Sequence, residues 1–313
     1  MTFSKIIKEE LSRQSSNARH CCIAEIAAML SVCGKLIIDD FGIKTLVLQT
    51  ENIMVARKYF TLVKKTFNIN TDIQIRKNMS AKHSNLYILR MEGREVERLL
   101  LTTKLSCYRL ENKELGLYTD HLVVQNTCCK RAFIRGAFLA AGSMSDPEKA
   151  YHLEIVLPDS KRANQLIDII NSFFIDAKVV VRKKYHVVYI KEGSQIVDLL
   201  NIMEAHNALM NFENVRILKE MRNSINRQVN CEAANINKTV MAATKQIDDI
   251  NFIKETIGFE GLSEGLEDVA KLRISYPEAS LKELGDMLCP PIGKSGVNHR
   301  LKKLSCIADG LRM

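Results

Sequence analysis

Residues 134–142 read Ile-Arg-Gly-Ala-Phe-Leu-Ala-Ala-Gly, an Ala-rich apolar run that ends in glycine. A second run of this kind, residues 24–34, reads Ala-Glu-Ile-Ala-Ala-Met-Leu-Ser-Val-Cys-Gly. Small side chains such as Ala28 and Gly136 let two helix backbones approach closely. Either run alone is typical of an ordinary core helix. Because both runs stand at the head of a repeat, we expect the two helices to pack against each other at a shared axis.

The repeat that contains these runs extends over most of the first two thirds of the chain. Ile75-Arg76-Lys77 matches Val181-Arg182-Lys183, and the Glu-Gly pair at 92–93 matches the pair at 192–193. The matches keep their order, and their offset drifts only from 108 residues at the two terminal glycines to 100 at the Glu-Gly pairs. A period this long indicates a duplicated half-domain rather than the short unit of a solenoid. A duplicated α+β unit usually forms a two-fold saddle or cleft.

Both copies are predicted to run helix, hairpin, helix, hairpin, helix. The first copy is expected to have helices at 20–33, 52–67 and 92–101 and strands at 35–40, 44–50, 71–77 and 85–91. The second is expected to have helices at 129–141, 160–174 and 193–204 and strands at 150–157, 177–184 and 186–191. Residues 103–127, rich in turn and polar residues, are expected to link the copies.

The domain organisation follows from where the strand pattern stops, at about residue 206. At 313 residues the chain has room for about two domains. We expect a duplicated domain over 1–205, with repeats at about 1–102 and 128–205, then a linker at 206–222 and a helical domain at 223–313. The predicted fold class is therefore α+β, a duplicated saddle with pseudo-two-fold symmetry followed by an all-α domain.

The positive charge is concentrated in the first part of the chain. The net charge is +9, yet residues 220–313 contain 13 Lys or Arg and 13 Asp or Glu. A basic first domain favours a polyanionic partner, with nucleic acid the leading candidate. A mildly basic solvated surface is the alternative. Candidate phosphate contacts are Arg76 and Lys77 on one hairpin, Arg182, Lys183 and Lys184 on its repeat, and Arg222 and Arg227 in an amide-rich stretch.

The cysteines give no metal-binding spacing. Nine are present, including the adjacent pairs Cys21-Cys22 and Cys128-Cys129, but there is no Cys-x-x-Cys. This spacing argues against a zinc site, and scattered thiols in odd number indicate reduced side chains in a cytosolic protein. Neither a signal pattern nor an apolar run of about 18 residues occurs. We therefore expect a cytoplasmic protein with no membrane partner.

The C-terminal region has the pattern of a helix-turn-helix at about 279–308. Ser280-Leu281-Lys282-Glu283 has the form of a capping box, and Ser295 is expected to cap a second helix after Pro290-Pro291. The stretch 294–303 contains four Lys or Arg and no acid. A helical hairpin with a solvated exterior is the alternative to a DNA-reading helix. The candidate DNA-contacting residues are Ser280, Lys282, Lys294, Ser295, Gly296, Asn298, His299, Arg300, Lys302 and Lys303.

The duplicated domain resembles the LAGLIDADG homing endonucleases. Ile134 to Gly142 fits their nine-residue motif, and Ile26 to Gly34 fits it more loosely. The resemblance implies two such helices at a pseudo-two-fold axis and saddle-shaped sheets that straddle DNA. In that family an acid just before the terminal glycine binds the catalytic metal, and the corresponding residues here are Cys33 and Ala141. Neither can hold Mg²⁺, which requires carboxylate oxygens, so we expect no metal, no catalytic residues and no enzyme activity.

The chain as a whole resembles the bacterial WhiA family. The resemblance covers nearly the whole sequence, and the segments that carry it are 131–146 with His152-Leu153-Glu154, 227–239 and 294–301. The helix-turn-helix also resembles region four of bacterial sigma factors. The resemblance implies a nucleoid-associated regulator of cell division, chromosome segregation and, in spore formers, sporulation. The implied partners are double-stranded DNA and, as further candidates, other regulators or RNA polymerase, with no cofactor and no small-molecule substrate. A residual nuclease and a protein-interaction scaffold stay open as alternatives.

Overall fold

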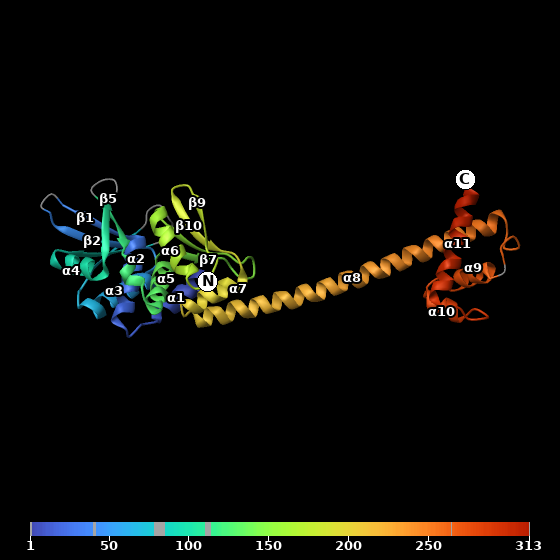
Figure 1. Cartoon of the computed structure of the whole chain (residues 1–313), viewed down its shortest axis with the longest axis horizontal. Coiled ribbons are helices and arrows are strands. Elements are labelled where there is room, and N and C mark those ends of the chain that lie inside the picture. Colours follow the sequence, from blue (N-terminus) through green and yellow to red (C-terminus); the bar gives the residue numbers. More distant parts are fainter. Residues whose placement is uncertain (1, 40–41, 78–84, 110–113, 264, 313) are drawn as a thin grey trace. The chain divides into compact units, whose positions relative to one another are not determined.

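The protein consists of two compact units. The computed structural model describes residues 2–39, 42–77, 85–109, 114–263 and 265–312 (Figure 1). The units are Met1–Lys219 and Glu220–Met313. Over the described residues the first unit mixes helices and strands, and the second contains helices alone.

Two helices form the centre of the first unit. Helix α2 (Arg19–Cys33) packs along helix α5 (Thr127–Ala141), and most residues of both are buried. A Cβ atom added at Gly136 would lie 2.6 Å from the backbone oxygen of Glu25 and 2.9 Å from the Cβ of Ala28. Such distances are too short for any larger residue, so the close approach predicted from the small side chains is confirmed.

Each repeat carries an antiparallel sheet with the same strand order. The second sheet is ordered β7-β8-β10-β9, and the first contains the equivalent order β1-β2-β4-β3. The shared order confirms the duplication. The strands are β1 (Gly34–Ile38), β2 (Lys44–Thr50), β3 (Asp72–Lys77), β4 (Asn85–Glu92), β7 (Gly142–Met144), β8 (Leu153–Leu157), β9 (Lys178–Arg182) and β10 (Tyr185–Ile190). The other helices of this unit are α1 (Phe3–Arg13), α3 (Ile53–Phe67), α4 (Arg94–Thr103), α6 (Ser160–Asn171) and α7 (Gly193–Ile202).

The expectation that residues 103–127 form a linker is wrong. The segment forms the hairpin β5 (Leu105–Arg109) and β6 (Glu114–Thr119), followed by the 3-10 helix η1 (His121–Val124). Strand β6 pairs with β1, so the hairpin extends the first sheet to six strands. Leu105 and Leu117 are buried in the core. Polar residues between these apolar positions hid the alternation, because only one face of the hairpin is buried.

The segment expected to link the domains is the start of a long helix, α8 (His206–Thr256). Its first turns belong to the first unit, where Ala208 and Phe212 are fully buried in the core. Near its other end, Ile250 and Ile253 are buried in the core of the second unit. The division between the units, after Lys219, therefore falls inside a continuous helix.

Three further helices complete the second unit: α9 (Leu266–Ser275), α10 (Leu281–Asp286) and α11 (Lys294–Arg312). The capping box predicted at Ser280 and Glu283 is confirmed, since each side chain bonds the backbone N–H of the other. The predicted cap at Ser295 is wrong. The N–H of Val297 donates to the carbonyl of Gly293, so the helix begins one residue before Ser295. None of the helices in the described ranges combines the length and apolarity needed to span a bilayer.

Candidate nucleic-acid interface

Helices α10 and α11 are held together by a small apolar core and a tight turn. Leu284 on α10 packs in one cluster with Val297 and Leu301 on α11. The N–H of Ile292 donates to the carbonyl of Gly285 at 3.1 Å, which folds the turn back onto α10. A Cβ atom at Gly285 would lie only 2.2 Å from the Ile292 oxygen. The turn therefore requires glycine at this position of the first helix.

Gly285→Ala is expected to lower the free energy of unfolding of the second unit by about 1–3 kcal/mol, because the added methyl group overpacks the turn. Urea unfolding followed by circular dichroism measures the change. Gly310→Ala is the matched control, since nothing lies within 4 Å of a Cβ atom there. Because alanine in an exposed helix is favoured over glycine by about 1 kcal/mol, Gly310→Ala should not lower the free energy of unfolding. If the two variants were equally stable, the close turn would be refuted.

The outer face of α11 carries polar and cationic side chains. Ser295, His299, Lys302 and Lys303 are exposed and recur at the spacing that places residues on one side of a helix. Asn298 and Gly296 are partly exposed beside them, and Lys294 is exposed at the first turn. The opposite side holds the buried Val297, Leu301, Leu304 and Ala308. On α10, Ser280 and Lys282 are exposed, although the Ser280 hydroxyl is engaged in the capping box.

The structure gives Arg300 a contact inside the protein. Its Nη1 donates to the carbonyl of Gly265 at 3.2 Å, and the guanidinium packs over that glycine. Gly265 has a φ of +86° and precedes the first residue of α9. A Cβ atom at Gly265 would lie 3.1 Å from the same nitrogen. Arg300 thus joins α11 to the start of α9.

The cationic hairpins lie at matching edges of the two sheets. Arg76 and Lys77 end β3, and Arg182 ends β9; both are edge strands, and every residue of both is exposed. Lys183 and Lys184 are exposed in the turn that follows β9. Matching placement agrees with the predicted repeat, so these cations stand in corresponding positions.

Arg182 is already engaged with a carboxylate. Its Nη1 lies 2.9 Å from Glu154 Oε2, and His152 Nε2 lies 3.1 Å from the same oxygen. Burial raises the pKa of Glu154, but hydrogen bonds from His152 and Ser143 together with the charge of Arg182 outweigh it and hold the pKa below its ordinary value. A phosphate would compete with this carboxylate for Arg182.

The two remaining candidate cations lie on α8. Arg222 and Arg227 are both exposed. A separation of five residues turns them about 140° apart around the helix axis. The two side chains therefore do not share one face of α8.

The positions of the lost metal ligands lie at the C-terminal ends of the central helices. Cys33 ends α2 and Ala141 ends α5, as the motif alignment predicts. Cys33 Sγ donates to the Met29 carbonyl at 3.2 Å, and burial raises its pKa to about 12. In the described part of the chain, no group of three or more His, Cys, Asp or Glu side chains surrounds either residue. A neutral thiol and a methyl group stand where a hydrolytic site needs carboxylates.

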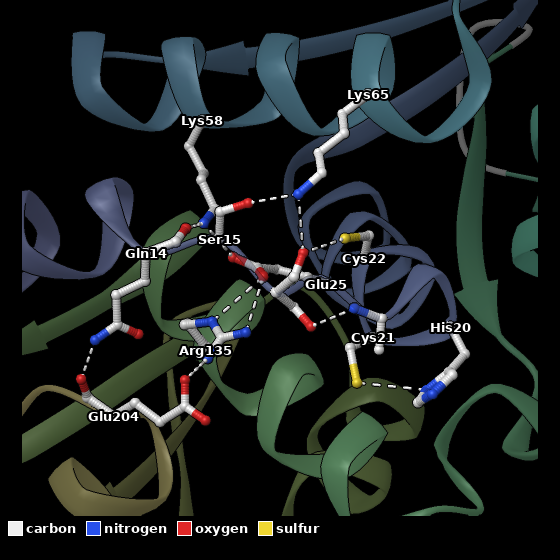
Figure 2. Close-up of polar contacts among 12 residues, drawn as sticks. Gln14, Ser15, His20, Cys21, Cys22, Glu25, Lys58, Lys65, Arg135 and Glu204 are labelled. Atoms are coloured by element: carbon white, nitrogen blue, oxygen red, sulfur yellow. Dashed lines mark hydrogen bonds and ion pairs between the residues drawn. The ribbon is translucent and has the colours of Figure 1, made fainter.

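A buried ionic cluster, which the sequence did not reveal, ties the two repeats together (Figure 2). Glu25 on α2 is fully buried, and its Oε2 accepts hydrogen bonds from Arg135 Nη2 at 3.1 Å and Nε at 3.3 Å. Lys58 Nζ lies 3.3 Å from Glu25 Oε1, and Arg135 Nη1 lies 2.7 Å from Glu204 Oε2. Lys58 also donates to the Gln14 carbonyl. The cluster thus joins α2, α3 and α5 to Glu204, which lies two residues before the start of α8.

The charges in this cluster respond to burial and to each other. Burial lowers the pKa of Lys58, and Glu25 opposes that effect without cancelling it. Burial also acts to lower the pKa of Arg135, but the carboxylates of Glu25 and Glu204 raise it above its ordinary value. Arg135 is therefore charged. Among the described residues it forms ion pairs with two carboxylates, those of Glu25 on α2 and of Glu204.

Known proteins match the chain along its whole length. Three family models match: the WhiA N-terminal LAGLIDADG-like domain over 19–106, the WhiA LAGLIDADG-like domain over 130–222 and the WhiA C-terminal HTH domain over 225–308. A protein of Lachnoclostridium phytofermentans named probable cell division protein WhiA is 71% identical over 313 residues, with all of both chains covered. The chain belongs to the WhiA family. The WhiA-named protein of Alkaliphilus oremlandii is 47% identical, over 100% of this chain and 98% of that one.

Solved structures of WhiA show the same fold. The crystal structure of full-length WhiA from Thermotoga maritima matches with a TM-score of 0.59 and 24% identity, over 99% of this chain and 98% of that one. The N-terminal LAGLIDADG domain of WhiA matches with a TM-score of 0.51 and 22% identity, over 64% of this chain and 90% of that one. The two LAGLIDADG-like models of the WhiA family include α2 and residues 130–141 of α5, and the HTH model includes α10 and residues 294–308 of α11. The predicted family, duplicated LAGLIDADG-like fold and helix-turn-helix are confirmed.

Proposed function

We propose that this chain is a non-enzymatic DNA-binding regulator of cell division, in which α11 reads double-stranded DNA. The observation that carries the proposal is the outer face of α11, where exposed cations and polar side chains gather on the second helix of a helix-turn-helix. Relatives at 71% and 47% identity carry the name probable cell division protein. The same proposal places the protein at the nucleoid in the cytoplasm. It also includes roles in chromosome segregation and sporulation, and contact with RNA polymerase or other regulators.

Different residues of α11 serve different parts of the duplex in this proposal. Asn298 and His299, near the N-terminal end of the helix, are suited to base edges in the major groove. Lys294, Lys302 and Lys303 are suited to phosphates, since a flexible ammonium reads charge rather than sequence. Arg300 supports this face by holding α11 against Gly265.

The first unit adds non-specific affinity or a protein surface rather than cleavage. Cys33 and Ala141 supply no carboxylate at the ends of α2 and α5, and Mg²⁺ requires oxygen ligands. Arg76, Lys77, Lys183 and Lys184 remain exposed on matching hairpins and are suited to phosphates on two sides of a duplex. We therefore assign sequence reading to the second unit.

Asn298→Ala is expected to weaken binding of the full chain to its specific site by about 1–3 kcal/mol, because one bidentate base contact is worth that much. Footprinting over genomic promoter fragments identifies the site, and titration of that site and of an unrelated duplex measures both affinities. Binding to the unrelated duplex should change little.

Cys306→Ser is the matched control, since Cys306 is exposed further along α11 and lies beyond the turns expected to enter the groove. It should bind both duplexes as the unmodified chain does. An Asn298→Ala protein that kept its selectivity would show that α11 is not the reading helix.

A further inference from the structure

Four side chains of types that can bind a metal ion lie together at the N-terminal ends of the two central helices. They are His20 and Cys21 on α2 and Cys128 and Cys129 on α5. Their ligating atoms, one imidazole nitrogen and three sulfurs, all lie within 4.8 Å of one another. His20 Nδ1 lies 3.1 Å from Cys129 Sγ, 3.4 Å from Cys21 Sγ and 3.9 Å from Cys128 Sγ. Figure 2 shows the contact between His20 and Cys21.

These separations fit a tetrahedral ion. Zinc holds thiolates at about 2.3 Å and imidazole nitrogen at about 2.0–2.1 Å, so neighbouring nitrogen and sulfur ligands stand about 3.6 Å apart. The three nitrogen–sulfur distances bracket this value. One histidine and three cysteines are also a recurrent ligand set of structural zinc sites, whereas Mg²⁺ and Ca²⁺ take oxygen ligands. We propose that His20, Cys21, Cys128 and Cys129 bind one Zn²⁺ ion that fastens the two repeats together.

The surroundings of the cluster suit such an ion. Each repeat supplies two ligands from the first turn of its helix. Cys21 and Cys129 are buried beside Ala24 and Ala132, which gives the site a firm apolar base. On the other side, a cavity of about 800 Å³ lined by His20, Cys21 and Cys128 provides a path for the ion to enter. Arg131 lines the same cavity and complements the net negative charge of Zn²⁺ with three thiolates.

The position distinguishes this site from the metal site of a homing endonuclease. Helices α2 and α5 are each 15 residues long. A rise of about 1.5 Å per residue therefore places the cluster roughly 20 Å from Cys33 and Ala141 along the helix axes. All four ligands come from the protein, which leaves no open position for a reacting water and marks a structural ion.

The sequence pattern could not show this site. Zinc motifs are recognised by ligands two to four residues apart, whereas His20 and Cys129 are 109 residues apart. The ligands become neighbours only because the two repeats pack their motif helices side by side. Cys22, the other member of the first pair, points elsewhere and donates to the Ser16 carbonyl.

Metal analysis of the full chain, refolded or purified with zinc and then dialysed, tests the proposal. About one zinc ion per chain is expected. Loading with Co²⁺ instead should give the intense visible absorption of a tetrahedral site and a thiolate-to-cobalt charge-transfer band. Cys128→Ala, at an exposed position, and His20→Ala should each lose most of the bound ion to a chelator that leaves the unmodified chain loaded. Cys231→Ser, an exposed cysteine of the second unit, is the control and should keep it.

Thermal unfolding provides a second readout that does not depend on metal analysis. Zinc that binds the folded state should raise the Tm of the unmodified chain and leave the Tm of Cys128→Ala unchanged. A folded chain that takes up no zinc would overturn the proposal. So would equal loading of the Cys128→Ala and unmodified chains, or a disulfide between Cys21 and either Cys128 or Cys129 in the freshly purified chain.

Discussion

Arg135→Met is expected to lower the free energy of unfolding of the first unit by about 3–5 kcal/mol, because it leaves a carboxylate buried without its principal cation. Glu25 is fully buried, and Arg135 donates to it from two nitrogens. Methionine fills a similar volume, so the loss reports the charge rather than a cavity. Lys58 remains 3.3 Å from Glu25 but already has a lowered pKa from burial, so it cannot replace the guanidinium in full. Urea unfolding of the full chain, followed at a probe in the first unit, measures the change.

Two further variants separate the buried pair from its exposed neighbour. Adding Glu25→Gln to Arg135→Met removes the stranded charge and should recover a large part of the loss, which a double-mutant cycle quantifies. Glu204→Gln removes the other carboxylate bound by Arg135, but that side chain is 45% exposed. An exposed pair is worth about 0–1 kcal/mol, so this variant should be close to the unmodified chain. If Arg135→Met were as stable as Glu204→Gln, the cluster would not hold the repeats together.

The parts of the fold that recur in the sequence could be predicted, and the parts set by packing could not. The motif helices and the Ser280 capping box follow from patterns within a few neighbouring residues, and the duplication follows from matches that keep their order along the chain. The hairpin β5–β6 was missed because it occurs in one copy alone and half of its residues are polar. The start of α11 was misplaced because glycine and serine are both accepted at an N-cap.

The site residues divide along the same line. Cations on the outer face of α11 follow from helical spacing, and the structure places most of them where the pattern predicts. The orientation of Arg300 toward Gly265 depends on a glycine 35 positions away. Glu25 and Arg135 stood out in the sequence only as charges within apolar runs, because their pairing across 110 positions depends on how the repeats pack. The cysteines and histidine at the helix ends were missed for the same reason.

The double variant Lys302→Ala, Lys303→Ala is expected to weaken binding to every duplex alike and to flatten its salt dependence. Each neutralised phosphate contributes about 0.9 to the slope of log K against log salt, so the slope should fall by about 1.8. Both side chains are exposed on α11 beside His299, where no acid of the stretch 294–303 opposes them. The ratio of specific to non-specific affinity should stay unchanged, since phosphate contacts do not read sequence. Titrations of the full chain over a range of salt, against the specific site and an unrelated duplex, give both quantities.

The control carries the same change of charge elsewhere in the second unit. Lys254 lies exposed on α8, and Lys271 on α9 is paired with Glu267 at 2.6 Å, so neither belongs to the reading face. Lys254→Ala, Lys271→Ala should leave the slope nearly unchanged if binding is local to α11, and should lower it equally if only the net charge matters. An unchanged slope in the Lys302, Lys303 variant would instead favour α11 as a surface for another protein, because a protein interface releases no condensed counterions from DNA. The two double variants therefore distinguish a groove-binding helix from a diffuse basic surface and from a protein-docking helix.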